Sequence, residues 1–572
     1  MQTWVDRFPG RLERELEEFW ERDLTFELDR AQLAEQGRVV LRGQLQRQDE
    51  QIELEVIYPD LFPYLRPEVR ALGLQLDRHQ NPYERNLCLL DRSTRAWNPS
   101  DTAAWLIAER VPHLLSLIET GGEVLRDGEA PQGEPASTYF PAALGTAVLV
   151  PTAALQLDAE AEAGSGRIYC SVAEPPRLQL RGLVGELAVK TRKRKSRVVA
   201  TADPELAARF GGHHLTFRWV RLKGPPAGNT ASDVLAAADA VRQGFGSPPW
   251  QTAADGELAI CGVVFEEEVA QGCFEDAWMF AVRARPAGVV QERSYLVRGE
   301  RLTRQDLGAR IPALSSLPEK RVAVIGAGAL GAGVALELAR AQLGELRVLD
   351  DDIVEAGTIV RWPSGLTAVG HSKVHVIAER IRLDYPFTSV VPFVHRLGQS
   401  ADVRTGRSET ELDVLDRLLE GADLVIDATA EIGVQQLIAA AADAEGIPQL
   451  YLSATEGARG GIVAPLIPPR PGCWLCLQWH LDTRSFPLPP RDETGTVQPR
   501  GCASPTFTGT GFDLLPIIAQ GARVATDILM GRAPGEVQIC SIPDDGSGVP
   551  NWESRVFDVH PKCPECSAAA AA

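Results

Sequence analysis

The chain has 572 residues, of which 44% are hydrophobic and 24% charged, and its formal net charge at pH 7 is −19. This composition is typical of a globular protein with roughly three or four domains. The negative charge argues against nucleic acid and anionic membranes as partners, because their phosphates would repel the chain. Charged residues interrupt the first 20 positions, and the uncharged apolar run at residues 322–336 is too short and too rich in glycine for a membrane span. We therefore expect a cytoplasmic protein whose partners are proteins or small molecules.

The first 125 residues predict a small α+β domain. Residues 11–24 have the pattern of a charged amphipathic helix, and "QIELEVIYP" (51–59) alternates apolar and polar residues as a half-buried strand does. Cys88 follows in a stretch rich in turn-forming residues, and a helix capped by Asp101 is predicted after it. Side chains in such irregular segments tend to be exposed to solvent. Cys88 is therefore a candidate for thiol chemistry, although an inert packed thiol is the commoner use of a lone cysteine.

The following region predicts a linker and an ordered middle domain to which we assign no chemistry. "RDGEAPQGEPAS" (126–137) is rich in glycine, proline and charge without periodicity. Strand-like segments at 177–190 and 214–222 and a helical segment at 231–245 follow. The basic run "KTRKRKSR" (190–197) is predicted to be a solvated loop, with a contact to a carrier or target protein as the alternative.

Residues 321–352, "RVAVIGAGALGAGVALELARAQLGELRVLDDD", predict a strand, a glycine-rich turn, a helix and a second strand. Gly326, Gly328 and Gly331 would let the backbone approach a phosphate at the helix N-terminus. Asp350 ends the second strand, where an acid can accept hydrogen bonds from ribose hydroxyls. The pattern predicts a Rossmann-like nucleotide site, but it serves nicotinamide dehydrogenases and adenylating enzymes alike.

Longer motifs narrow that choice. "GAGALG", "LDDDIVEAGTIVR", "VGHSKVHVIAERI" and "ADLVIDATAE" resemble the ThiF and MoeB adenylation domains shared with ubiquitin-activating (E1) enzymes, over about residues 300–572. The resemblance implies that the site binds ATP and that a donor protein's C-terminal carboxylate attacks the α-phosphate to give an acyl adenylate. It also implies phosphate contacts for Arg361 and Lys373, which would offset charge on the transferring group, and nucleotide contacts for Asp350 and Asp352.

The chain departs from that family's pattern at two positions. Thr358 stands where the family usually carries an asparagine, and Ala430 stands where it carries a magnesium-associated aspartate. Asp427 and Glu431 remain nearby, and a carboxylate oxygen near the phosphates is what this hard cation needs. We leave the Mg²⁺ ligand open between these two residues. The loss of the aspartate also keeps a catalytically inactive scaffold among the alternatives.

Two further residues carry roles that the same resemblance implies. "RLTRQ" (301–305) resembles the arginine-bearing helix that this family lends across a homodimer, so Arg304 is expected to act in the site of a second copy. Cys502 lies in "GCASPTFTGTGFDLLPIIAQ" (501–520), the segment where activating enzymes of this family carry their thioester cysteine. A mobile loop suits a nucleophile that must reach an acyl phosphate after it has formed.

Two pairs of cysteines have the C-x-x-C spacing of a metal site. Cys473 and Cys476 lie in "GCWLC", and Cys563 and Cys566 lie in "KCPEC". Four thiolates can close a tetrahedral shell around Zn²⁺, which would tie the C-terminal tail to the domain core. Two redox pairs are the alternative.

The stretch around Cys88 has a resemblance of its own. "YPDLFPYLRPEV", "HQNP", "NLCLL" and "WNPS" together resemble the core of ubiquitin-conjugating (E2) enzymes over about residues 10–125. The resemblance implies that Cys88 is the acyl acceptor and that Asn81 stabilises the oxyanion when an amine attacks the thioester. His79 is expected to hold the loop rather than transfer protons. The chain departs from the pattern at Gln80, which replaces the usual proline, and Asn81 is closer to Cys88 than in the family.

These observations predict a multidomain α+β and α/β protein. Its expected parts are an N-terminal E2-like (UBC) α+β domain at 1–125, a linker and middle domain at 126–311, and a C-terminal Rossmann-like ThiF/E1 adenylation domain with a zinc site at 312–572. This order resembles the fused activating and conjugating ligases of bacterial antiphage CBASS operons. In that family the acyl donor is the C-terminus of a cyclic-oligonucleotide synthase.

The implied function is ATP-dependent protein conjugation with ATP, Mg²⁺ and Zn²⁺ as cofactors. A donor with a free C-terminus, either a ubiquitin-like protein or a nucleotidyltransferase, would be adenylated, passed as a thioester from Cys502 to Cys88, and joined to an amine of a target protein. The alternatives are a sulfur-carrier adenylyltransferase, an inactive scaffold and a nicotinamide dehydrogenase.

Overall fold

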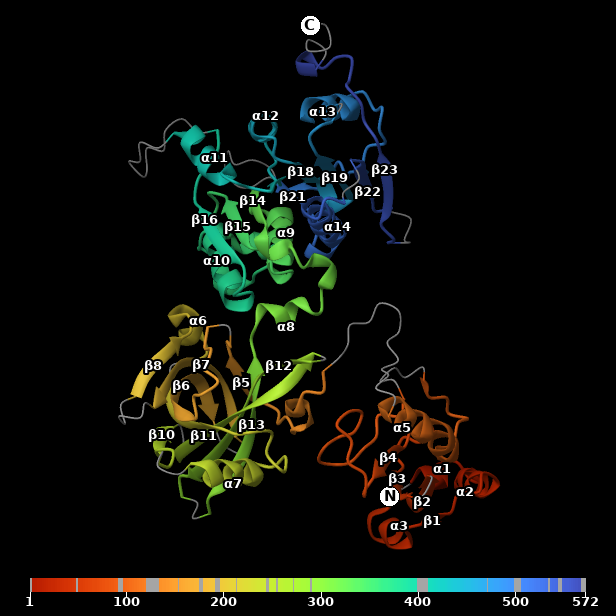
Figure 1. Ribbon diagram of the computed structural model, residues 1–572. Coiled ribbons are helices and arrows are strands. Elements are labelled where there is room, and N and C mark those ends of the chain that lie inside the picture. The colour runs from red at the N-terminus through yellow and green to blue at the C-terminus, as the bar shows by residue number, and fades with distance from the viewer. Residues whose placement is uncertain are drawn as a thin grey trace. The chain divides into compact units, whose positions relative to one another are not determined.

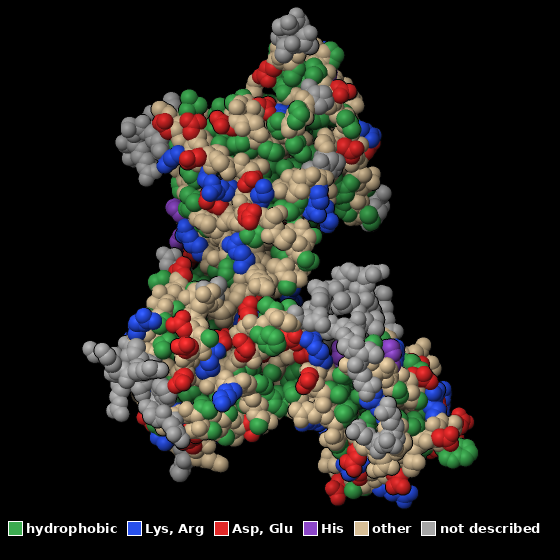
Figure 2. All heavy atoms as spheres, viewed as in Figure 1, with side chains coloured by type: hydrophobic (Ala, Val, Ile, Leu, Met, Phe, Trp, Pro, Cys, Tyr) green, Lys and Arg blue, Asp and Glu red, His purple; other side chains and the backbone are tan. Residues whose placement is uncertain are grey.

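The computed structural model divides the chain into two compact units, residues 1–302 and 303–572 (Figure 1). None of its described helices is long and apolar enough to cross a membrane. On the face drawn in Figure 2, basic and acidic side chains are interspersed rather than gathered by sign. The residues described are 3–47, 50–90, 96–119, 133–152, 154–173, 178–190, 196–211, 213–242, 246–253, 256–270, 272–288, 291–398, 410–470, 472–497, 506–532, 535–543 and 548–566.

The first unit begins with a small antiparallel sheet. Its strands follow the chain in the order β1-β2-β3-β4. The predicted alternation at 51–59 is confirmed, since Ile52, Leu54 and Val56 of β3 are buried beside Phe19 of α2. The elements of this part are α1 (Trp4–Arg7), α2 (Arg11–Glu21), β1 (Phe26–Leu28), α3 (Arg30–Gln36), β2 (Val40–Arg47), β3 (Glu50–Ile57), β4 (Glu68–Ala71), α4 (Ala103–Trp105), η2 (Leu106–Arg110) and α5 (Val111–Glu119).

The helix predicted after Cys88 is present as α4, the π-helical turn η2 and α5, but its cap is not the expected residue. The Thr102 hydroxyl accepts a hydrogen bond from the Trp105 N–H at 3.2 Å. Asp101 instead accepts from the Asn98 N–H at 2.9 Å, one turn earlier. The prediction of a cap at Asp101 was therefore wrong by one residue, because the threonine hydroxyl satisfies the helical N–H.

The middle of the chain forms a closed barrel that the sequence did not predict. Its strands pair in the ring β11-β12-β13-β5-β7-β6-β9, and β9 pairs back with β11. The interior is filled by Phe217, Trp219, Trp278 and Phe280, all at most 1% exposed. The elements are η3 (Ala136–Tyr139), β5 (Thr146–Val150), β6 (Ala163–Ala173), β7 (Gln179–Lys190), β8 (Ser196–Thr201), α6 (Pro204–Arg209), β9 (His213–Arg221), α7 (Ala231–Val241), β10 (Gln251–Ala253), β11 (Gly256–Ala270), β12 (Cys273–Pro286) and β13 (Arg293–Arg301).

The second unit is built on one mixed sheet in the order β16-β15-β14-β17-β18-β19-β22-β23. The strands from β16 to β18 are parallel, and β19, β22 and β23 are antiparallel. Residues alternate along β14, so Val322 and Val324 enter one core with α9, α10 and α14, while Ala323 and Ile325 enter another with α11 and α12. Helices on both faces confirm the predicted Rossmann-like arrangement of this region.

The helices and strands of this unit follow in chain order. They are α8 (Arg304–Gly308), η4 (Pro312–Leu314), η5 (Leu317–Glu319), β14 (Arg321–Ile325), α9 (Ala329–Arg340), β15 (Glu345–Leu349), η6 (Ala356–Val360), η7 (Leu366–Ala368), α10 (Lys373–Asp384), β16 (Ser389–Phe393), α11 (Glu411–Leu419), β17 (Leu424–Asp427), α12 (Ile432–Glu445), β18 (Gln449–Ala454), η8 (Glu456–Ala458), β19 (Gly460–Leu466), α13 (Trp474–Asp482), β20 (Thr496–Val497), β21 (Thr506–Phe507), α14 (Gly511–Leu529), β22 (Val537–Ser541) and β23 (Asn551–Arg555).

Candidate functional site

The predicted nucleotide residues meet where the strand order of the second unit reverses. β14 lies between β15 and β17, so the connections from β14 and from β17 run to opposite sides of the sheet. Ligands of open parallel sheets bind in the crevice at the carboxyl ends of such strands. Gly326 follows β14, Asp350 follows β15, and Asp427 ends β17. The fold therefore gathers at one edge three residues that lie far apart in the sequence.

The turn after β14 needs glycine at two of the three predicted positions. Gly326 has a φ of +92°, in the left-handed region, and a Cβ there would approach the Ala428 carbonyl oxygen at 2.8 Å. A Cβ on Gly331 would lie 1.9 Å from the Gly326 carbonyl oxygen. Gly328 is the N-cap of α9. The glycine turn thus presents the N-terminus of α9 at the carboxyl edge, where N–H groups can meet a phosphate.

Asp350 holds this turn in place through hydrogen bonds to the backbone. Its Oδ2 accepts from the Ala327 N–H at 2.6 Å, and its Oδ1 accepts from the Asp352 N–H at 2.8 Å. Burial raises the pKa of the Asp350 carboxyl, and the Lys373 ammonium opposes that rise. Each carboxylate oxygen has a second lone pair, so a ribose hydroxyl can still donate to Asp350.

Lys373 lies beside the second predicted acid at the start of α10. Its Nζ is 2.6 Å from Oδ2 of Asp352, and its side chain is only 11% exposed. The backbone N–H of Lys373 also donates to the Asp352 carbonyl at 3.0 Å. The structure therefore brings Lys373 and Asp352 together. They lie at the same edge of the sheet as Asp350, which accepts a hydrogen bond from the glycine turn.

Arg361 lies against the segment that follows the predicted thioester cysteine. Its guanidinium donates to the Phe507 carbonyl and to the Thr506 hydroxyl, and it lies 4.6 Å from the centre of the Phe507 ring. Burial lowers the pKa of this guanidinium. Cys502 itself lies outside the described residues. Arg361 therefore reaches β21, a strand that begins at Thr506 within the segment that carries Cys502.

Sequence reasoning missed the neighbour of Arg361. The indole N–H of Trp362 donates to the Ala327 carbonyl at 2.9 Å, and the ring is 5% exposed. Ala327 of the glycine turn is thus held at both backbone groups, its carbonyl by Trp362 and its N–H by Asp350. The sequence feature that could have identified Trp362 is its position directly after Arg361, a predicted phosphate ligand.

The two candidate carboxylates for Mg²⁺ have different surroundings. Asp427 is fully buried, and burial raises its pKa to about 6. Its Oδ1 accepts two hydrogen bonds from Thr429, whereas Oδ2 has no hydrogen-bond partner among the described residues. Glu431 is exposed and is the N-cap of α12. A cation or a proton at Oδ2 of Asp427 would satisfy this buried oxygen, so Asp427 fits a metal ligand.

Arg304, the predicted finger for a second copy, contacts its own chain. Its guanidinium donates to the carbonyls of Phe387 and Pro318 and lies 5.8 Å from the centre of the Phe387 ring. The Thr303 hydroxyl caps the short helix α8 that carries Arg304. In this conformation Arg304 ties α8 to the residues after α10.

The four cysteines of the two C-x-x-C pairs converge. All four sulfur atoms lie within 4.8 Å of one another; Cys473 is 3.8 Å from Cys476 and 3.6 Å from Cys563, and Cys566 completes the group. Four sulfurs around tetrahedral zinc lie about 3.8 Å apart, because each Zn–S bond is about 2.3 Å. Disulfides would need sulfurs about 2.05 Å apart. The geometry therefore fits a Zn²⁺ site better than two redox pairs.

The loop of Cys88 is a short two-stranded pairing beside β4. Gln80 pairs with Leu87, and both are buried, at 3% and 8% exposure. The Cys88 N–H donates to the His79 carbonyl at 2.8 Å, and the Asn81 N–H donates to the Asn86 carbonyl at 2.8 Å. Because side chains alternate along paired strands, Cys88 is displayed on the outer face, and it is exposed.

Gln80 explains how this loop is held without the expected proline. Its Oε1 accepts from the Leu76 N–H at 2.8 Å, and its Nε2 lies within hydrogen-bond distance of the carbonyls of Ala71, Leu74 and Arg85. One buried amide thus ties four backbone groups of the surrounding turns together. No local pattern of residues predicts this role, since the hydrogen-bond partners of Gln80 are set by the folded loop.

Asn81 is fixed by its own turn. Its Oδ1 accepts from the N–H groups of Tyr83 and Glu84 at 2.9 and 3.1 Å, which is an Asx turn. The amide orientation is therefore set, and Nδ2 carries the donor hydrogens that an oxyanion requires. The pairing of the loop places Asn81 on the same outer face as Cys88.

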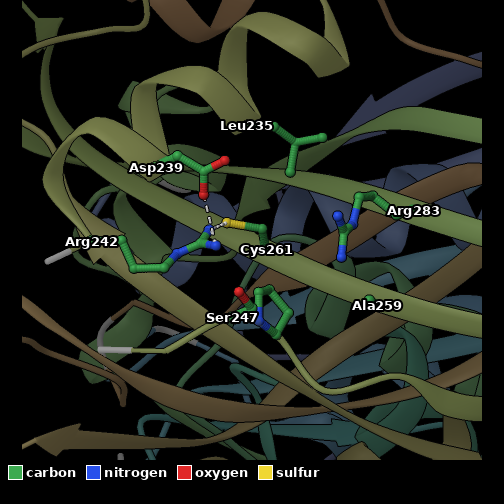
Figure 3. A pocket seen from close by; sticks show the side chains of 8 residues that line it. Leu235, Asp239, Arg242, Ser247, Ala259, Cys261 and Arg283 are labelled. Atoms are coloured by element: carbon green, nitrogen blue, oxygen red, sulfur yellow. Dashed lines mark hydrogen bonds and ion pairs between the residues drawn. The ribbon is translucent and has the colours of Figure 1, made fainter. Parts of the chain in front are cut away.

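Three other thiols have surroundings that keep them protonated. Burial raises the pKa of Cys170, Cys261 and Cys540 to about 11. Cys261 lines a cavity of about 90 Å³ between α7 and the barrel, where Arg242 donates to its sulfur at 2.9 Å and pairs with Asp239 at 2.8 Å (Figure 3). Thiolates, not thiols, are nucleophiles, so these positions fit packing rather than acyl transfer.

Comparison with known proteins identifies the C-terminal region. Residues 303–512 match the ThiF family. The uncharacterized protein y4oA of Sinorhizobium fredii is 32% identical over 552 residues, covering 90% of this chain and 89% of y4oA. The adenylyltransferase and sulfurtransferase UBA4 of Yarrowia lipolytica is 32% identical over 182 residues, covering 30% of this chain and 38% of UBA4.

A third relative matches over a shorter region. The ATP-dependent ubiquitin transferase-like protein Cap2 of Enterobacter hormaechei is 29% identical over 150 residues, covering 26% of this chain and 23% of Cap2. The chain thus spans less than half the length of UBA4 and of Cap2 but nearly the whole of y4oA. It belongs to the same family as y4oA, and its C-terminal region is a ThiF-family domain with an adenylation fold.

Proposed function

We propose that this protein is an ATP-dependent protein-conjugating enzyme. Its C-terminal region would adenylate the C-terminal carboxylate of a donor protein, and the acyl group would pass to Cys502, then to Cys88, then to an amine of a target. The observation that carries the proposal is the meeting of Gly326, Asp350 and Asp427 at the switch point of a ThiF-family domain. The names of UBA4 and Cap2 support adenylation and ubiquitin-like transfer.

Adenylation would proceed by attack of a donor carboxylate oxygen on the α-phosphorus of ATP, with pyrophosphate as leaving group. The glycine turn would cradle the phosphates at the start of α9, and the ribose would meet Asp350, with Asp352 at the pocket's edge. Lys373 and Arg361 would offset charge that grows on the phosphoryl group. The contacts of Arg361 with Thr506 and Phe507 support a link between the phosphate site and the Cys502 segment.

We assign Mg²⁺ first to Asp427. Its Oδ2 is a buried carboxylate oxygen with no hydrogen-bond partner among the described residues, and oxygen ligands are what Mg²⁺ prefers. Glu431, exposed at the N-terminus of α12, is the second candidate. Bound magnesium would neutralise charge on the β- and γ-phosphates. We assign Zn²⁺ to Cys473, Cys476, Cys563 and Cys566.

The first 125 residues would act as an E2-like conjugating domain. The antiparallel sheet, the exposed Cys88 on an irregular loop and the helix that follows are the features that support this role. Asn81, fixed by its Asx turn, would donate from Nδ2 to the oxyanion formed at the Cys88 thioester. The amine would be a side chain or terminus of a target protein.

The partners follow from this chemistry. The donor needs a free C-terminus, which a ubiquitin-like protein or a nucleotidyltransferase would supply, and the match to Cap2 supports a place in bacterial antiphage defence. We also propose a cytoplasmic homodimer in which Arg304 serves the nucleotide site of the second copy. Sulfur-carrier adenylation remains the second candidate, because UBA4 is named as both adenylyltransferase and sulfurtransferase, but it would leave Cys88 without a role.

The test is to trap the acyl group at Cys88. Cys88→Lys would convert a thioester into a stable isopeptide, and mass spectrometry of the adduct purified from cells would identify the donor's C-terminus. Cys273→Lys is the matched control, since Cys273 is exposed on the barrel outside the proposed site. No adduct on Cys88→Lys, together with donor-dependent pyrophosphate exchange, would favour sulfur transfer. Absence of exchange with any donor would favour the inactive scaffold.

A further inference from the structure

We propose that the indole N–H of Trp362 sets the direction in which the glycine turn offers a backbone N–H group to the phosphates of ATP. This role rests on the proposed function and adds a positioning residue to the nucleotide site. Trp362 directly follows Arg361, but its ring lies in the domain core, where it is 5% exposed. Trp362 would therefore act on the nucleotide through the turn rather than by contact.

The backbone of Ala327, in the middle of the turn, is held at both of its polar groups. The Trp362 indole N–H donates to the Ala327 carbonyl at 2.9 Å, and the Ala327 N–H donates to Oδ2 of Asp350 at 2.6 Å. Ala327 is fully buried, so water cannot replace either partner. Loss of the indole donor would leave a buried carbonyl unsatisfied, and the turn could satisfy it only by changing its conformation.

The contact with Trp362 also fixes the next N–H along the chain. The peptide bond between Ala327 and Gly328 is trans, and in a trans peptide the C=O and N–H bonds point in opposite directions. A carbonyl that points to the buried indole therefore directs the Gly328 N–H away from the core. Gly328 is the N-cap of α9, and a Cβ built on it would meet no atom within 4 Å. A phosphate oxygen on this open side of the turn could accept from that N–H.

The segment that carries Trp362 is itself fixed. The Trp362 and Arg361 N–H groups both donate to the Thr358 carbonyl, at 2.9 and 3.1 Å, and the Arg380 guanidinium donates to the Pro363 carbonyl. These contacts hold the indole in place on both sides along the chain. It is therefore a preorganised donor against which the glycine turn is oriented before any nucleotide arrives.

The experiment separates phosphate recognition from the rest of nucleotide binding. Trp362→Phe keeps an aromatic ring in the core but removes the N–H donor. Equilibrium dialysis of the full-length protein gives its Kd for ATP and for adenosine. We expect the ratio of the adenosine Kd to the ATP Kd, which reports the gain in affinity from the phosphates, to fall about tenfold. The adenosine Kd should remain that of the wild type, because adenosine has no phosphate.

Two further variants control for packing. Trp97→Phe makes the same change in the first unit, where the Trp97 indole donates to the Pro63 carbonyl at 2.8 Å and the ring is 8% exposed. It should leave both affinities unchanged. Benzothienylalanine at position 362 carries sulfur in place of the indole N–H and keeps both rings. It should therefore reproduce the loss seen in Trp362→Phe, even if that variant folds poorly.

The outcomes distinguish this role from the function on which it rests. A wild-type ratio of the two Kd values in either Trp362 variant overturns the inference. An equal loss of ATP and adenosine affinity also overturns it, because a purely structural role would give that result. If the wild-type protein binds ATP no more tightly than adenosine, the nucleotide site of the proposed function fails, and the inference fails with it.

Discussion

Asp427 accepts two hydrogen bonds from Thr429 through one oxygen, from the N–H at 3.0 Å and from the hydroxyl at 2.8 Å, while its second oxygen is buried without a hydrogen-bond partner among the described residues. Burial raises the pKa of Asp427 to about 6, from 3.8. Because the folded pKa lies above the unfolded one, the native state binds this proton more tightly. The resulting stabilisation is fully present below the unfolded pKa and is lost as pH rises through the folded pKa.

We predict that Asp427→Asn stabilises the fold and abolishes adenylation. The neutral amide keeps an acceptor for Thr429 but removes the buried charge, so unfolding free energy at about pH 8 should rise by roughly 1–3 kcal/mol, with little difference near pH 4. Denaturant unfolding at several pH values and pyrophosphate exchange would measure the two effects. Glu431→Gln should leave stability unchanged, since Glu431 is exposed. A variant less stable than wild type at high pH would contradict the prediction.

One zinc ion per chain is predicted in the purified protein. Cys563→Ser should remove it and lower the free energy of unfolding by an amount on the order of 5 kcal/mol, because the metal would tie the tail to α13. Elemental mass spectrometry and thermal unfolding would report both changes. Cys540→Ser, at a buried thiol outside the cluster, should retain zinc. Native protein that lacks zinc and in which all four clustered thiols react with an alkylating agent would disprove the site.

Gln80→Ala should loosen the Cys88 loop. The change removes hydrogen bonds to the backbone of Ala71, Leu74, Leu76 and Arg85 and leaves buried polar groups without that partner. We expect the free energy of local opening to fall by about 2–4 kcal/mol. Hydrogen exchange of the amides at 71–87 would measure it. Gln75→Ala, at an exposed position, is the matched control, and equal exchange in both variants would argue against the role of Gln80.

The order of the two thiols can be read from single substitutions. Cys88→Ala should accumulate a reductant-sensitive donor adduct on Cys502, whereas Cys502→Ala should form the adenylate but load neither cysteine. Both should fail in conjugation, which gel shifts with and without reductant would follow. Wild-type charging of Cys88 in Cys502→Ala would replace the relay with direct loading from the adenylate.

The proposed homodimer predicts that mixed chains complement each other. If Arg304 serves the site of the other copy, then a chain with Arg304→Ala combined with a chain with Lys373→Ala should recover part of the adenylation that each variant lacks alone. Pyrophosphate exchange by isolated heterodimers is the measurement. Arg304 contacts Phe387 and Pro318 of its own chain, so a purely structural role would instead give destabilised Arg304→Ala protein and no recovery.

Patterns of short range were sufficient to predict the centre of the second unit. A strand, a glycine turn and a helix lie within residues 321–340, and the close packing of Gly331 against Gly326 is set over a few residues. The alternation of 51–59 predicted β3 for the same reason, since burial of every second side chain is a local property of a strand. The pairing of Cys473 with Cys476 is likewise local, because a spacing of three residues corresponds to about one turn of α13.

Contacts between distant segments had to come from the tertiary structure. The sequence determined that Cys88 lies on an irregular loop and that acids follow the Rossmann strands. Only the fold decided that β9 closes the barrel on β11, that Arg361 reaches Phe507, and that the two cysteine pairs converge. The physical reason is that local periodicity fixes which face of an element is apolar, whereas the partner of a polar side chain depends on how the whole chain packs.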